Sequence, residues 1–259
     1  MTAAICCGRL RLSCAASILT VVVALAGCGA HVTGHAAKST AHEPALPIEQ
    51  LVPTADEVSR VVGSTMERSL VKSSHDTKPL LPGIADTVPA ECAVVTTVGL
   101  SRAYAHAPVT ATQIQEWDTR DDGNLLTEPD VHVRVAVVEL STADATRTLY
   151  QQFTDQWRQC QSTPIVEHLG DPAQTVDTNN VLNVSENAGL LTAVDVETSN
   201  NRYDSQAGPI QTERAVTITG RFLIDVSMVS IDGFEHPVPA PEHATAVAKL
   251  IVCQIVSNT

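Results

Sequence analysis

The clearest hydrophobic pattern in this 259-residue chain is alternation, which predicts β-strands. Residues 131–140 carry valines at 131, 133, 135 and 137, with His132, Arg134 and Ala136 between them. Successive side chains of a strand point to opposite faces, so this stretch predicts a strand with one buried face. Shorter or weaker patterns predict further strands at 93–105, 110–118, 164–168, 180–185 and 189–197.

The longest alternating stretch covers residues 214–229. Its polar positions, which include Arg214 and Asp225, are expected on one face, and its apolar positions on the other. Gly220 interrupts the pattern, which predicts one half-buried strand that is bent or broken at this glycine. The residues expected to share the apolar face are Val216, Ile218, Phe222, Ile224, Val226 and Met228.

Helical periodicity predicts three helices. Thr54 and Glu57 have the spacing of a capping box, and a short apolar stripe follows them up to Gly63. A second capping signal at 141–144 precedes a helix that runs to about residue 160. The last helix begins after Pro241. The apolar stripe of the middle helix comprises Leu149, Phe153, Trp157 and Cys160, and that of the last comprises Ala244, Val247, Ala248, Ile251 and Ile255.

The order of these elements is helix, strands, helix, strands, helix. Neighbouring strands joined by turns favour an antiparallel sheet, and the helices are expected to pack on one face of it. The chain is therefore predicted to be an α+β protein with a single folded domain at residues 51–259.

The first residues have the pattern of a secretory leader. Arg9 and Arg11 precede an apolar stretch of about 12 residues, which is too short for a membrane-spanning helix of about 20. This stretch ends in Leu25-Ala26-Gly27-Cys28, which is typical of a bacterial lipobox. A chance cysteine after an ordinary signal peptide is the alternative. We predict a signal peptide at 1–27 and lipid attachment at Cys28.

A lipidated Cys28 would anchor the chain to the extracytoplasmic face of the cell membrane. Residues 28–50 have no apolar period and are rich in Ala, Gly, Thr, His and Pro, which predicts a flexible tether. The formal net charge of −13 argues against nucleic acid and against docking on anionic lipid through charge. Alternatively, the negative charge serves only to keep the protein soluble.

The leader changes the cysteine count. The chain has seven cysteines, and leader removal with acylation of Cys28 leaves Cys92, Cys160 and Cys253. One bridge and one leftover thiol are then possible, in any of three pairings. Cys253 falls in the apolar last helix, where a lone cysteine acts as a small buried hydrophobe. This position favours the pair Cys92–Cys160 and leaves Cys253 as the free thiol.

Several segments resemble the extracellular sensor domain of PknH-type serine/threonine kinases, which also occurs alone in mycobacterial lipoproteins. The resemblance covers about Leu51 to Ile255, and its most specific part is the helix ending in Trp157 to Cys160. It implies an α+β domain with a sizeable cleft and two disulfides. The segments are "LVPTADEVSRVVG", "VPAECAVV", "VRVAVVELSTADATRTLYQQFTDQWRQC" and "TERAVTITGRFLIDVSMV".

The chain departs from this family pattern at two positions. Ser162 stands where the family has the second cysteine of a Cys-x-Cys, and Thr212 stands where the family has its fourth cysteine. Both halves of one bridge are therefore missing together. The resemblance thus implies the remaining bridge, Cys92–Cys160, and a reduced, buried Cys253.

Motifs for catalysis or metal binding are not found in the sequence. It has no nucleophile elbow, no phosphate-binding Gly-rich loop, no His-Glu-x-x-His, no Cys-x-x-Cys and none of the kinase signatures. The stretch 118–129 is reminiscent of a calcium loop, but Arg120 and Pro129 occupy ligand positions, so a turn is predicted. His236 and His243 are not expected to hold a metal. We expect neither an enzyme nor a cofactor.

The sequence is compatible with two classes of function and disfavours a third. The first is a ligand-binding or sensing lipoprotein, whose cleft holds a small molecule, a lipid or a cell-wall fragment. The second is an envelope module that docks on another protein, and the third is a cell-envelope hydrolase. The residues that line the cleft are not assigned by the sequence.

Overall fold

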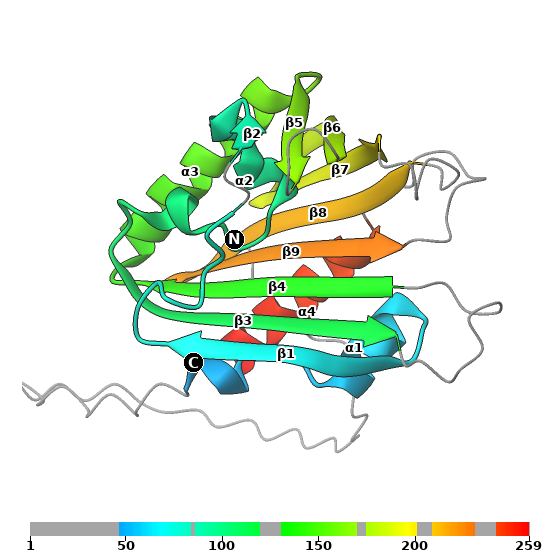
Figure 1. The fold of residues 1–259 in the computed structure, drawn as a ribbon. Helices are drawn as coiled ribbons and strands as arrows, with labels where there is room; N and C mark the ends of the chain where they lie inside the picture. Colours follow the sequence, from blue (N-terminus) through cyan, green and yellow to red (C-terminus); the bar gives the residue numbers. More distant parts are fainter. Residues whose placement is uncertain are drawn as a thin grey trace, which may run out of the picture. The chain divides into compact units, whose positions relative to one another are not determined.

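The computed structural model describes residues 47–83, 86–119, 131–169, 175–200, 209–230 and 242–258. They form one nine-stranded sheet in which every neighbouring pair is antiparallel, in the order β1-β3-β4-β9-β8-β7-β6-β5-β2 (Figure 1). The described residues also form four α-helices. The predicted α+β class is therefore confirmed.

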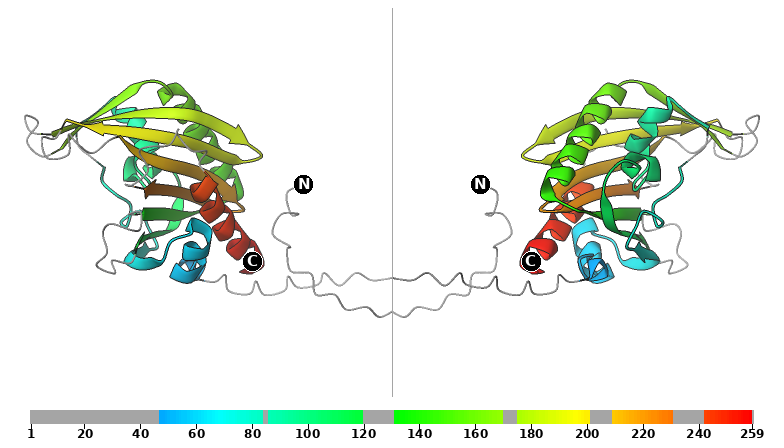
Figure 2. Two further views of the ribbon diagram at one scale, coloured as in Figure 1. Left: turned by 90° about the vertical axis from the view of Figure 1, so that its right-hand side faces the viewer. Right: turned by 90° about the vertical axis from the view of Figure 1, so that its left-hand side faces the viewer.

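The sheet contains nine strands of very different length. They are β1 (Met66–Ser74), β2 (Asp86–Val88), β3 (Val109–Thr119), β4 (Val131–Leu140), β5 (Pro164–Leu169), β6 (Thr175–Asn187), β7 (Leu190–Ser199), β8 (Ile210–Thr219) and β9 (Phe222–Ser230). The helices are α1 (Ala55–Val62), α2 (Ala93–Thr96), α3 (Ala143–Cys160) and α4 (Glu242–Asn258), with short 3-10 helices η1 (Ile48–Gln50), η2 (Ala90–Cys92) and η3 (Ser101–Tyr104). The sheet is twisted, so in Figure 2 the strands β6 and β7 run in a different direction from β3 and β4.

The sheet carries a hydrophobic core on each face. One core joins α1 and α4 to valines 131, 133, 135 and 137 of β4, and the other joins α2 and α3 to Ala136 and Val138 of the same strand. The expectation that all helices pack on one face is therefore wrong. The physical reason is that the central strands are apolar on both sides, so each side needs a cover.

The stretch 214–229 is a hairpin and not one long strand. β8 and β9 are joined by Gly220 and Arg221, and Gly220 has a φ of +53°, which suits a tight turn. Thr219 pairs with Phe222, so odd-numbered residues of β8 share a face with even-numbered residues of β9. Consequently Val216 packs on the α3 side, while Phe222, Ile224, Val226 and Met228 pack on the α4 side.

The predicted strand at 93–105 is also wrong, because this segment forms α2 and η3. Its residues 93–95 are a continuous apolar run, and periodicity alone does not separate a buried strand from a buried helix. Gly99 (φ +64°) brings the segment against the sheet, since a Cβ there would lie 2.8 Å from Ile114 Cδ1 and 3.1 Å from Ala136 Cβ. This segment covers the hydrophobic core that lies between α3 and the sheet.

The three predicted helices are confirmed, and the predicted capping box is confirmed for α1 alone. Thr54 and Glu57 form the capping box of α1. The cap of α3 is Thr142, whose hydroxyl accepts a hydrogen bond from the Ala145 N–H at 3.1 Å. The start of α4 is capped from the sheet, since the Glu213 carboxylate accepts the backbone N–H groups at the first turn at 2.8 and 2.9 Å.

The short helix η1 lies within the segment that was predicted to be a tether. Ile48 of η1 is only 7% exposed and belongs to the α4-side core, so the last residues of the predicted tether are part of the fold. Cys28 and the predicted turn at 121–124 lie outside the described residues. Within the described ranges, no helix is both long and apolar enough to cross a membrane.

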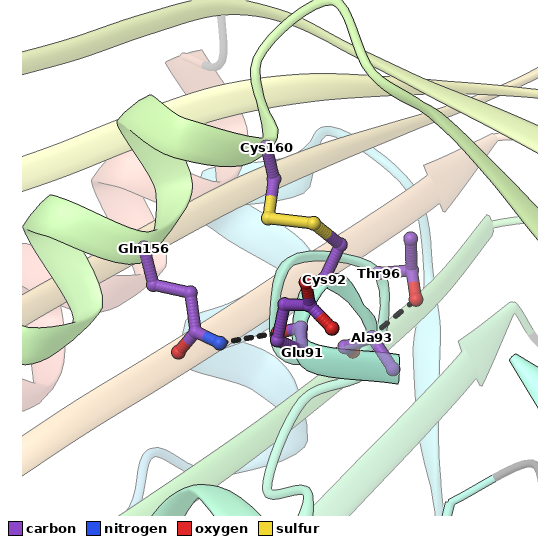
Figure 3. Close-up of a disulfide and its surroundings, with 6 residues drawn as sticks. All are labelled: Glu91, Cys92, Ala93, Thr96, Gln156 and Cys160. Carbon is purple, nitrogen blue, oxygen red and sulfur yellow. Dashed lines mark hydrogen bonds between the residues drawn. A yellow bond between two sulfur atoms is a disulfide. The ribbon is translucent and has the colours of Figure 1, made fainter. Parts of the chain in front are cut away.

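Cys92 and Cys160 form a disulfide, as predicted (Figure 3). The bond joins η2 to the last residue of α3, and both cysteines are buried. The expectation of a free and buried thiol at Cys253 is wrong, because this residue is half-buried and disulfide-bonded. It lies beside the buried stripe of α4, between Ile251 and Ile255, and not on it.

Candidate functional site

Two polar features lie on the α3 side of the sheet. The first is a groove between α3 and the segment from η2 to η3, which we call the α3 groove. The second is a group of acidic residues on β5, β6 and β7, which we call the acidic cluster. The cluster comprises Glu167, Asp177, Asp195 and Glu197, together with the amide of Asn179.

The α3 groove has a volume of about 260 Å³. Its apolar floor includes Phe153 and Val94, both of which belong to the α3-side core. Exposed charged side chains stand at its edge: Glu91 on one element and Arg102 on another. Drug-sized ligands occupy pockets of about 300–1,000 Å³, so this groove suits a smaller molecule. The other lining residues are Ala103, His106, Ala107, Gln152 and Gln156.

Two links hold the walls of the α3 groove together (Figure 3). The Gln156 side-chain amide on α3 donates a hydrogen bond to the Glu91 carbonyl on η2. One turn further along α3, Cys160 is bonded to Cys92, which follows Glu91 in the chain. The disulfide therefore fixes η2 against α3 and sets the width of the groove at this end.

The sheet register gathers the acidic cluster on one face. Glu167 lies directly opposite Asp177, and Asn179 lies directly opposite Glu197. Asp195 is two residues from Glu197 along β7, so both point to the same side. Like charges directly opposite each other on neighbouring strands destabilise a sheet, so this arrangement is costly to the fold.

All members of the cluster except the half-buried Glu197 are buried, and three of its polar atoms lack partners among the described residues. The Thr96 hydroxyl of α2 donates a hydrogen bond to Glu167 Oε1 at 3.0 Å. By contrast, Asp177 Oδ1, Asp195 Oδ1 and Asn179 Nδ2 find no hydrogen-bond partner among the described residues. Buried polar groups are nearly always paired in native proteins, so three such atoms on one face require an explanation.

Burial also changes the acidity of the cluster. Burial raises the pKa of Asp195 to about 7. The positive charge of Arg214 opposes this rise, whereas the negative charges of Glu197 and Glu167 add to it. Burial, helped by Asp177 and Glu167, raises the pKa of Glu197 to about 7. Burial raises the pKa of Glu167 as well, although its bond from Thr96 opposes this. Perturbed carboxyl groups of this kind gather at functional sites.

We expect Asp195→Asn to stabilise the protein at pH 8 and to change its stability little at pH 5. The folded chain holds a proton on Asp195 up to about pH 7, whereas the unfolded chain loses it near pH 4. Stability therefore falls as the pH rises between these values, and the asparagine removes that loss. Thermal midpoints at several pH values measure the effect. Asp155→Asn, on the exposed side of α3, is the control, and an equal gain at both pH values would contradict the expectation.

A buried ion pair lies on the same face of the sheet as the acidic cluster. Arg214 is 0% exposed and Asp225 is 1% exposed, and Arg214 Nη2 donates to Asp225 Oδ1 at 2.7 Å. Arg214 also donates to the Val95 carbonyl and lies 5.3 Å from the centre of the Trp157 ring. Asp225 Oδ2 accepts the Gly99 N–H at 3.0 Å. The pair thereby ties α2, its following loop and α3 to the sheet.

Sequence reasoning did not identify these residues. Arg214 and Asp225 were expected at a polar surface and are instead fully buried. The hairpin register places both on the α3 side of the sheet, and α2, the loop after it and α3 cover them there. The signal for the cluster was present in Asp195 and Glu197, which are two apart in a predicted strand and share a face. In the described part of the chain, no set of three His, Cys, Asp or Glu residues is arranged to hold a metal ion.

Comparison with known families assigns residues 44–258 to a profile described as the PknH-like extracellular domain. The chain belongs to the family of PknH-like extracellular domains. The resemblance stated from the sequence is confirmed, and this family's domain occupies nearly all of the folded unit.

Two solved structures are similar to this chain. The extracellular domain of PknH from Mycobacterium tuberculosis is 19% identical, with a TM-score of 0.61, and the match covers 82% of this chain and 98% of that chain. An uncharacterized protein from Mycobacterium smegmatis is 12% identical over 77% of this chain and 97% of that chain, with a TM-score of 0.36. The first match shows that the PknH-like fold is shared. A search of the curated proteins finds no significant match.

Proposed function

We propose that this PknH-like extracellular domain is a non-catalytic sensor that binds a small zwitterionic ligand in the α3 groove. A lipid on Cys28 holds it at the outer side of the cell membrane. The observation that supports the ligand class is the pair of opposite charges at the groove. Glu91 and Arg102 both line it, both are exposed, and neither side chain forms an ion pair within the described residues.

The groove offers one partner for each part of such a ligand. Arg102 suits a carboxylate, because its guanidinium binds carboxylates in a bidentate manner. Glu91 suits an ammonium group, and Phe153 with Val94 offers an apolar floor for a side chain. A volume of about 260 Å³ fits an amino acid or the end of a short peptide. These are the chemical features of cell-wall peptide fragments and of free amino acids.

Calorimetric titration of the full chain in detergent with L-leucine tests this function. We expect leucine to bind, and 4-methylpentanoate and 3-methylbutylamine, each lacking one charged group, to bind at least tenfold more weakly. Arg102→Ala is expected to weaken leucine binding by about ten- to a hundredfold, since hydrogen bonds to charged groups contribute about 1.5–3 kcal/mol. Arg158→Ala, an exposed arginine on α3 outside the groove, is the matched control. Equal binding of all three compounds would refute the zwitterion assignment.

The anchor has its own test. We expect wild-type protein from cells to partition into the detergent phase and to have a mass increased by acyl chains on Cys28. Cys28→Ala should be released into the aqueous phase, because each buried methylene contributes about 0.8 kcal/mol to membrane attachment. The control is Ser257→Ala, at an exposed position of α4, which should still partition with detergent. Equal partitioning of Cys28→Ala and wild type would show that the lipid is absent or elsewhere.

A further inference from the structure

We infer that the acidic cluster is a second binding site, separate from the α3 groove, for a hydroxylated amine such as an amino sugar. The inference rests on the placement of its charges and on the unpaired atoms beside them. It does not depend on the proposed occupant of the groove.

The first step is the charge pattern. Glu167 and Asp177 face each other across two strands, while Glu197 and Asp195 continue the row on the next strand. The row thus crosses three neighbouring strands, which lie about 4.8 Å apart. An extended ligand with several polar groups matches such a row. A ligand ammonium near Glu167 and Asp177 would relieve their mutual repulsion.

The second step is an independent observation, the amide of Asn179. This side chain is 1% exposed, lies between the carboxylates on the same face, and keeps Nδ2 without a hydrogen-bond partner among the described residues. A donor in this place requires an acceptor on the ligand. A ligand hydroxyl meets both needs, because it accepts from Asn179 and donates to a neighbouring carboxylate.

The third step is the positive charge around the cluster. Arg214 on β8 is already engaged by Asp225, the Val95 carbonyl and the Val226 carbonyl. Arg102 on η3 acts on Glu167 only through its field and lines the α3 groove. No described arginine or lysine forms an ion pair with a carboxylate of the cluster, so the cluster retains capacity for a cation.

The fourth step is access. Glu197 is half-buried, whereas Glu167, Asp177 and Asp195 are buried. Glu197 is therefore the carboxylate of the cluster that a ligand in solution meets first. On ligand binding, the cation favours the ionised carboxyl groups, which lowers the pKa values that burial has raised.

The test is a calorimetric titration of the full chain in detergent at pH 7 with glucosamine, N-acetylglucosamine and glucose. The three sugars share a ring, and only glucosamine carries the ammonium group. We expect glucosamine to bind at least tenfold more tightly than the other two. Equal affinities for glucosamine and N-acetylglucosamine would overturn the inference, because the carboxylates would then contribute no selectivity.

Two variants locate the binding. Glu167→Gln with Asp177→Asn removes the opposed charges and is expected to weaken glucosamine binding at least tenfold. Asn179→Leu removes the unpaired donor and is expected to weaken it several-fold. Neither change introduces a charge, and the thermal midpoint of each variant is measured to check that it folds. Unchanged affinity in the double variant would overturn the site.

Further variants separate this site from the α3 groove and from simple surface charge. Asp155→Asn, an exposed carboxylate on α3, should leave glucosamine affinity within twofold. Glu91→Gln should also leave it within twofold while weakening leucine binding in the groove. A loss of glucosamine binding in Asp155→Asn equal to that in the double variant would show diffuse attraction to an acidic protein and would overturn the inference.

Discussion

Arg214→Ala is expected to lower the free energy of unfolding by about 3–5 kcal/mol, because it leaves the Asp225 carboxylate buried without its counter-charge. Asp225 is 1% exposed and then keeps only the Gly99 N–H as a described donor. The change also removes the donor to the Val95 carbonyl and the cation over the Trp157 ring. Unfolding in guanidinium chloride, followed by the signal of the buried tryptophans, measures the loss.

Arg221→Ala is the matched control for this prediction. Arg221 is in the β8–β9 turn, is 45% exposed, and pairs with Glu139 at 2.7 Å. Exposed ion pairs contribute about 0–1 kcal/mol, so the same change of residue type should cost little there. If both variants lost the same stability, Arg214 would not be an essential part of the core.

The double variant Arg214→Met with Asp225→Leu should recover only part of the stability. Replacing a whole buried pair by apolar residues is often neutral or stabilising. Here, however, the Val95 carbonyl and the Gly99 N–H would both lose a partner, and each unpaired buried group costs about 1–3 kcal/mol. Full recovery would show that α2 and its loop do not depend on these bonds.

The sequence was sufficient where each element carried its own local signal. The capping box of Thr54 and Glu57 placed α1, and the apolar stripe ending at Cys160 placed α3. Alternation placed β4, although it did not show that the other face of this strand is covered too. Local periodicity reports which side is apolar, and it does not report how many layers pack on the sheet.

The candidate sites depended on information that one segment does not carry. The two-residue turn at Gly220 brings Arg214 and Asp225 to the same face of the sheet, and a long alternating pattern conceals this turn. The meeting of Glu167 with Asp177 is set by strand register. The α3 groove requires α2 and η3 to lie across the sheet, and their apolar residues resembled a strand in the sequence. Each candidate site is therefore formed by contacts between segments that are distant in the sequence.

Removal of the disulfide by Cys92→Ala with Cys160→Ala is expected to lower the free energy of unfolding by about 4 kcal/mol. The two cysteines are 68 residues apart, and the chain-entropy model gives about this value for a closed loop of that length. Both side chains are buried, so loss of their packing adds to the effect. Equilibrium unfolding of the variant and of the oxidised wild type provides the comparison.

The single variants Cys92→Ala and Cys160→Ala serve as controls, because each already breaks the bond and should lose nearly as much stability as the double variant. A loss below about 1 kcal/mol in all three would contradict a bridge that constrains the chain. The double variant should also weaken leucine binding, since the bridge holds η2, and with it Glu91, against α3. Glucosamine binding should change less, because its proposed residues lie on β5, β6 and β7, and sheet pairing holds them in register.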